Sequence, residues 1–85
     1  MFGLFKSKEQ KMFDGCDFNL AAQVLVYTYC SSVIPNDLGQ LLDQYLDNPN
    51  YKTALEITKK YPDFMVYFEQ CKPGGLYTRI GLPKN

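Results

Sequence analysis

The sequence has no histidine and no tryptophan, and its nine basic residues balance nine acidic ones. The lack of histidine removes the commonest general base, proton shuttle and metal ligand. A net charge of zero provides no overall field to attract nucleic acid or an acidic membrane. These absences disfavour an enzyme, a metal protein, and a nucleic-acid-binding protein that relies on overall charge.

Cysteine is scarce, and Cys16, Cys30 and Cys71 are too far apart to form a C-x-x-C pair. A structural zinc site usually needs four closely spaced ligands, so no zinc site is expected. An odd cysteine count without an apparent signal peptide is typical of free thiols in a reducing compartment, which predicts a cytoplasmic protein. Cys71 is the best candidate for a reactive thiol, because the neighbouring Lys72 would lower the pKa of that thiol.

Other motifs that carry chemistry are also missing. We find no Gly-rich phosphate loop, no nucleophile elbow and no calcium-loop spacing. Asp43 and Asp47 are an i, i+4 pair without a third ligand, so we interpret them as part of a solvated helix face. The sequence therefore predicts no cofactor, no metal and no catalytic residue.

The longest apolar run is residues 19–34, which carries no charge. It is shorter than the roughly 20 residues that cross a bilayer, and it contains Gln23. Its β-branched and aromatic residues at 24–29 favour a strand, but its length favours a helix. We predict a central helix over residues 19–34 that ends at Pro35. The face expected to be buried consists of Ala22, Leu25, Val26, Tyr29 and Val33.

Two further helices are predicted from apolar spacing and capping residues. The second helix covers residues 37–47 with Asn36 as N-cap, and the third covers residues 51–60 with a Glu56–Lys60 pair. A helical turn or two over residues 7–13, with Ser7 as N-cap, is also plausible, and the apolar residues of this segment are expected to fold back onto the core. The apolar stripe of the second helix is Leu38, Leu41, Leu42, Tyr45 and Leu46. Gly39 within it suggests a close helix crossing.

The C-terminal part has two interpretations. Residues 62–71 can form a fourth helix followed by an extended tail over residues 76–85. Alternatively, residues 65–80 can form a β-hairpin with a turn at 73–75. We favour the helix because an isolated hairpin is only marginally stable. The predicted fold class is therefore all-α, a single domain over residues 1–85 with about four helices; α+β is the alternative. Residues 1–13 could be a mobile segment of it.

By elimination, the sequence predicts a non-catalytic protein–protein interaction module, such as an adaptor, inhibitor or accessory subunit. Tyrosine suits surfaces that alternate between wet and dry, and a lone arginine suits an interaction hot spot. The candidate partner-binding residues are Tyr45, Tyr67, Tyr77 and Arg79. A chain this short can also form a homodimer to cover apolar surface.

An alternative role uses the N-terminal segment, where aromatic residues alternate with lysines. Phe2, Phe5, Lys6, Lys8 and Lys11 could contact a membrane surface or nucleic acid. Three lysines and one short apolar cluster bind lipid only weakly, so this role is less favoured.

Overall fold

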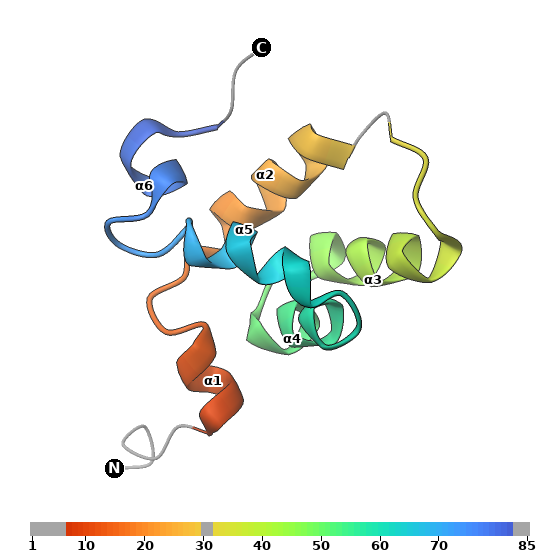
Figure 1. The fold of residues 1–85 in the computed structure, drawn as a ribbon, viewed down its shortest axis with the longest axis horizontal. Helices are drawn as coiled ribbons and strands as arrows, with labels where there is room; N and C mark the ends of the chain where they lie inside the picture. The colour runs from red at the N-terminus through yellow and green to blue at the C-terminus, as the bar shows by residue number, and fades with distance from the viewer. Residues whose placement is uncertain (1–6, 30–31, 83–85) are drawn as a thin grey trace.

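A computed structural model describes residues 7–29 and 32–82 of this chain. In these residues it contains six α-helices, one short 3-10 helix and no strand (Figure 1). The elements are α1 Lys8–Met12, α2 Phe18–Tyr29, α3 Asn36–Asp47, α4 Tyr51–Lys60, η2 Pro62–Phe64, α5 Met65–Glu69 and α6 Leu76–Ile80. The all-α prediction is confirmed for this part of the chain, and the alternative of a β-hairpin over residues 65–80 is wrong.

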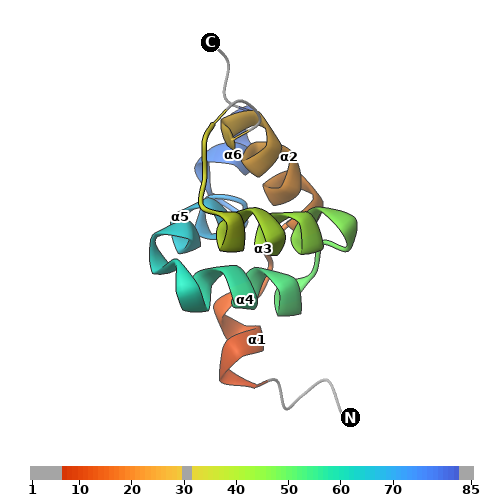
Figure 2. The ribbon, with the colours of Figure 1, turned by 90° about the vertical axis from the view of Figure 1, so that its right-hand side faces the viewer.

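Helices α3 and α4 form an antiparallel pair at the centre of the fold (Figures 1 and 2). Helix α5 contacts α2, and η2 contacts α4, so the segment after α4 returns across the bundle. Helix α1 lies beyond α4, at the opposite end of the molecule from α6 (Figure 2). In this arrangement Val26 and Tyr27 of α2 remain exposed.

The core is built around large side chains from several helices. The largest fully buried ones are Tyr45, Phe68, Leu25, Ile57, Val24 and Cys71. The Phe68 ring makes edge-to-face contacts with Phe13 and Tyr45, each with ring centroids 5.5 Å apart. Because Phe13 is buried, the end of the N-terminal segment folds back onto the core as predicted.

Two predicted helix starts are present with their capping residues. The Ser7 side chain accepts a hydrogen bond from the Gln10 backbone N–H, and the Gln10 side chain accepts one from the Ser7 N–H. Asn50 caps α4 in the same reciprocal way with Thr53. Each such cap satisfies backbone donors that the first helical turn leaves unpaired. Helix α3 differs slightly, because Asn36 is its first residue and Pro35 stands at the N-cap position.

Helix α2 differs from the predicted central helix in its length and in its buried face. It ends at Tyr29, and residues 32–35 are not helical. The buried face consists of Ala21, Val24 and Leu25, whereas Val26 is 47% exposed and Val33 is fully exposed. The predicted buried face was partly wrong because α2 itself carries apolar residues on more than one face. Two overlapping faces were equally apolar, and hydrophobicity alone could not select between them.

The C-terminal segment also differs from the prediction. Residues 76–80 form helix α6 instead of part of an extended tail. The Gln70 side-chain oxygen accepts a 2.7 Å hydrogen bond from the Leu76 N–H, and the Thr78 hydroxyl donates to the Lys72 carbonyl at 2.8 Å. These bonds join the start of α6 to the end of α5, a pairing that apolar spacing does not reveal.

Candidate interaction surface

The exposed side of α2 is an apolar feature of the described surface. Val26 and Tyr27 are 47% and 39% exposed, and α2 carries no charged residue between Phe18 and Tyr29. Two hollows adjoin this helix, one on each side of Val26. We call the residues that line them the α2 surface.

The first hollow is a groove of about 210 Å³ between α2 and α3. Its lining is Leu25, Val26, Tyr29, Ile34, Gly39, Leu42, Asp43 and Leu46. All of these except Asp43 are apolar or lack a side chain. A β-carbon at Gly39 would meet only the Ile34 Cδ1 atom, at 3.8 Å. Gly39 therefore leaves space in the groove and does not mark the close helix crossing that the sequence suggested.

The second hollow, of about 350 Å³, continues the apolar surface across α2. It is lined by Ala22, Gln23, Val26, Tyr27 and Leu82. Val26 belongs to both hollows and forms the ridge between them. A substitution of Val26 would therefore change both hollows at once.

Tyr29, which lines the groove, is held in place by contacts with other aromatic side chains. The Tyr29 ring stacks on Phe64 with centroids 5.4 Å apart, and its hydroxyl lies 3.1 Å from the Tyr67 hydroxyl. Burial and this hydrogen bond raise the pKa of Tyr29 to about 12. Tyr29 is therefore neutral at physiological pH, and its position does not depend on a titration near pH 7.

Tyr45 is not available for partner binding, contrary to the sequence prediction. Its side chain is completely buried, and its hydroxyl donates a 2.6 Å hydrogen bond to the Phe18 carbonyl. Burial is the main cause that raises the pKa of Tyr45 above its ordinary value. Tyr45 is thus a core residue that joins α3 to the start of α2.

The other three predicted residues lie away from the groove. Tyr67 and Tyr77 are half-buried, and Arg79 is exposed on α6. Tyr67 supports the groove indirectly through Tyr29, whereas Tyr77 and Arg79 line neither hollow. They remain candidates for partner contact, but they do not form one site with Val26.

The predicted N-terminal contact site is described only in part. Lys8 and Lys11 are exposed on α1, and Met12, the last residue of that helix, is 42% exposed. Phe2, Phe5 and Lys6 lie outside the described residues.

Cys71 does not have the properties of a reactive thiol. It is completely buried, and this burial raises the pKa of its thiol to about 11. The Lys72 amine is directed elsewhere, since it donates a 2.6 Å hydrogen bond to the Met12 carbonyl. The expectation that Lys72 activates Cys71 was wrong, because burial disfavours the thiolate that reactivity requires. Half-buried Cys16 likewise has its pKa raised to about 12, mainly by burial, and Cys30 lies outside the described residues.

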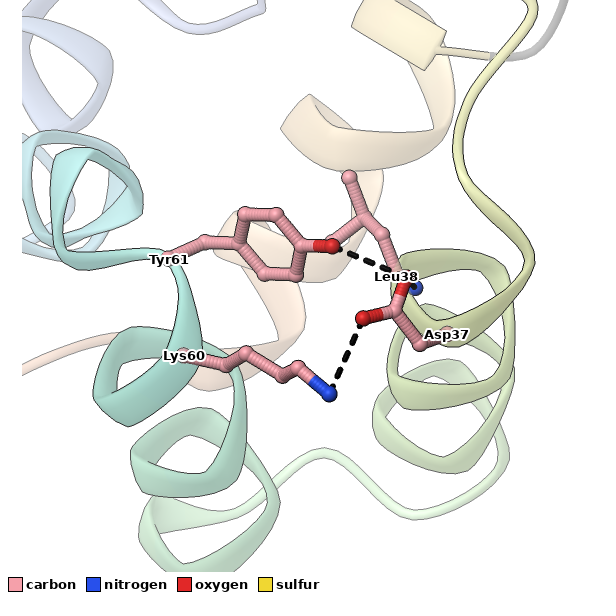
Figure 3. Close-up of polar contacts among 4 residues, drawn as sticks. All are labelled: Asp37, Leu38, Lys60 and Tyr61. Atoms are coloured by element: carbon pink, nitrogen blue, oxygen red, sulfur yellow. Dashed lines mark hydrogen bonds and ion pairs between the residues drawn. The ribbon is translucent and has the colours of Figure 1, made fainter.

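A polar cluster joins α3 to the end of α4 (Figure 3). The Asp37 carboxylate accepts hydrogen bonds from the Tyr61 hydroxyl at 2.9 Å and the Leu38 N–H at 2.9 Å, and it pairs with the Lys60 amine at 3.0 Å. The predicted partner of Lys60 was Glu56, so this ion pair is a correction. The cluster satisfies its own polar groups, and we interpret it as a clasp between two helices.

Beside this clasp lies a wider hollow of about 490 Å³ between α3 and α4. Its lining is Asp37, Gln40, Leu41, Gln44, Glu56, Lys59 and Lys60. Charges of both signs are mixed there, and Asp37 already has its partners. This hollow therefore offers less selective recognition than the α2 surface.

Among residues 7–29 and 32–82, no three or more His, Cys, Asp or Glu side chains lie together so that they could hold a metal ion. In the same part of the chain, no helix has the length and apolar character to span a bilayer. Comparisons with protein-family models, curated proteins and solved structures give no match to this chain.

The α2 surface was missed at the sequence level, although a signal for it existed. Residues 18–29 contain more apolar side chains than one buried helix face can use. The surplus had to be exposed or covered by another molecule. Which residues formed that surplus depended on the rotation of α2, which the sequence did not determine.

Proposed function

We propose that this chain is a non-catalytic protein-interaction module that binds a partner protein through the α2 surface. The observation that carries the proposal is the position of Val26, which is 47% exposed between two apolar hollows on an uncharged helix. Large exposed apolar patches on small proteins often mark sites of protein association.

Two further observations support this class of function. The surface is backed by ordered contacts, since Tyr29 is stacked on Phe64 and hydrogen-bonded to Tyr67. A preformed wall lowers the entropy cost of association. Cys16 and Cys71 are free thiols, which agrees with the proposed location in the reducing cytoplasm.

Site-specific photocrosslinking in host cells tests the proposal. A photoreactive phenylalanine analogue is placed at Val26, and a matched control carries it at Val66, which is 51% exposed on α5. We expect a discrete adduct with another protein from position 26 and none from position 66. No adduct from either position, or the same adducts from both, would contradict the proposal.

A second candidate function uses α1. Lys8, Lys11 and Met12 are exposed together on this short helix, which is the arrangement that an anionic membrane surface or nucleic acid would contact. Co-sedimentation with anionic vesicles and binding to a labelled oligonucleotide test it directly. Binding that disappears in Lys8→Glu/Lys11→Glu, and persists in Val26→Asp, would favour this function over the first.

A further inference from the structure

We infer that the groove between α2 and α3 accepts a basic amphipathic helix of the partner protein. This inference rests on the proposed function and specifies the chemistry of the partner. The helix would place aliphatic side chains in the groove and a lysine or arginine next to Asp43.

Asp43 is the one charged residue among the described residues that line the groove. Helix α2 has no charged residue, and α3 carries Asp37, Asp43 and Asp47 without any lysine or arginine. Asp37 is already paired with Lys60. Asp43 lines the groove, yet it forms no ion pair or hydrogen bond within residues 7–29 and 32–82. The group that complements the Asp43 carboxylate electrostatically is therefore a cation.

The apolar part of the groove favours a helical segment as the occupant. Leu25, Val26, Leu42 and Leu46 line it from two helices, and the space of about 210 Å³ holds only a few aliphatic side chains. An amphipathic helix presents such side chains at positions i, i+3, i+4 and i+7, and it has no unpaired backbone groups in its middle. An extended peptide would instead leave its backbone donors facing an apolar wall, where no sheet edge is available to pair them.

A second copy of this chain fits the groove less well. A two-fold symmetric contact brings the same patch of both copies together. The groove-lining Asp43 and the nearby exposed Asp47 would then face an identical acidic rim. Like charges placed opposite each other disfavour such a contact. Charge complementarity thus selects a different, basic partner.

A displayed library of helical peptides of about 15 residues tests this inference, because helices of that length are marginally stable alone and are stabilised by docking. Positions i, i+3, i+4 and i+7 are aliphatic, and the other positions are randomised between Lys, Glu, Gln and Ala. The bait is the full chain. We expect the selected peptides to be enriched in Lys, and to lose binding to the Val26→Asp variant but not to Val66→Asp.

Fluorescence anisotropy with the best peptide measures the contribution of Asp43. We expect Asp43→Lys to weaken binding by about fivefold at low salt, since it replaces one exposed attraction by a repulsion. Asp63→Lys is the matched control, because Asp63 is exposed and lines neither hollow. Its affinity should equal that of the unaltered chain, and circular dichroism should show that all variants are folded.

The outcomes separate the inference from the function on which it rests. If Glu-rich and Lys-rich peptides bind equally and Asp43→Lys has no effect, the basic partner is wrong, although a Val26-dependent groove remains. If no peptide binds in a Val26-dependent manner and photocrosslinking also fails, both proposals are wrong. If sedimentation shows a dimer that Val26→Asp dissociates, the occupant is a second copy and the inference is overturned.

Discussion

The hydroxyl of Tyr45 donates a 2.6 Å hydrogen bond to the carbonyl oxygen of Phe18, 27 positions away in the sequence. This bond joins the last turn of α3 to the first residue of α2. The ring of Tyr45 is at the same time packed edge-on against Phe68. One side chain thereby fixes the position of the start of α2 relative to the core.

Tyr45→Phe should lower the free energy of unfolding by about 1 kcal/mol, the usual net value of one hydrogen bond. The loss stays small because Phe18 is helical and its carbonyl can still accept the bond of the α2 ladder. Urea unfolding followed by circular dichroism measures it. Tyr61→Phe, which removes the hydroxyl that donates to Asp37 at a half-buried site, is the control and should cost less, because Tyr45 is completely buried. An equal cost for both variants would contradict a special role for Tyr45.

Val24→Asp and Val26→Asp should destabilise the chain to very different extents, although the residues are two positions apart. Val24 is fully buried, so a carboxylate there should cost about 3 kcal/mol or more and unfold much of the chain. Val26 is 47% exposed, so its substitution should cost less than about 1 kcal/mol. Thermal unfolding monitored by circular dichroism decides this. If Val26→Asp unfolds the chain, α2 is rotated differently from the position described above.

A comparison of α2 with α3 and α4 shows what the sequence could determine. Helices α3 and α4 were predictable almost to the residue, because each has a single apolar stripe and recognisable ends such as Asn50. Helix α2 was predictable as a helix but not in its rotation. The absence of helix at residues 32–34 also had no local signal, since the next proline is Pro35.

Whether a given side chain is buried or exposed was harder to predict than the helices. Tyr45 belongs to an apolar stripe, but only the distant Phe18 carbonyl makes complete burial of its hydroxyl favourable. Conversely, Val26 resembles a core residue by composition and is half-exposed. Both outcomes depend on contacts between segments far apart in the sequence, which apolar spacing within one helix does not encode.

Asp37 should make the stability depend on acid pH. Hydrogen bonds from Lys60 and Tyr61 hold the pKa of Asp37 below its ordinary value of 3.8. A depressed folded-state pKa means that the contribution to stability is complete above the ordinary value and is lost as the pH falls through the lower one. Asp37→Asn should remove this part of the acid dependence. Urea midpoints between about pH 2 and 6 measure it, with Asp63→Asn as control; equal profiles for Asp37→Asn and the unaltered chain would contradict the clasp.

At alkaline pH the stability should fall. Burial raises the pKa of Cys71 from 9.0 to about 11 and that of Cys16 from 9.0 to about 12. The unfolded chain therefore loses these protons first, so the free energy of unfolding decreases from about pH 9 upwards. Cys16→Ala should make this decrease less steep, as measured by urea unfolding at several pH values under reducing conditions. A slope that is unchanged by the substitution would show that the Cys16 thiol titrates normally in the folded state.

Gly75→Ala should disrupt the start of α6, whereas Gly39→Ala should stabilise the chain. A β-carbon on Gly75 would clash with the Gln70 carbonyl oxygen, a backbone atom that cannot move without opening the turn. At Gly39 the only neighbour is Ile34, at an ordinary 3.8 Å, and alanine gains about 0.5–1 kcal/mol of helix propensity.

Hydrogen exchange resolves the two effects separately. The Tyr77 N–H donates to the Gln70 carbonyl, so Gly75→Ala should speed the exchange of that amide more than the exchange of amides in α4. In Gly39→Ala, exchange in α4 should be slower or unchanged. Protection of Tyr77 that survives Gly75→Ala would show that α6 is held by the Leu76 and Thr78 side-chain bonds to the preceding segment and not by the close approach at Gly75.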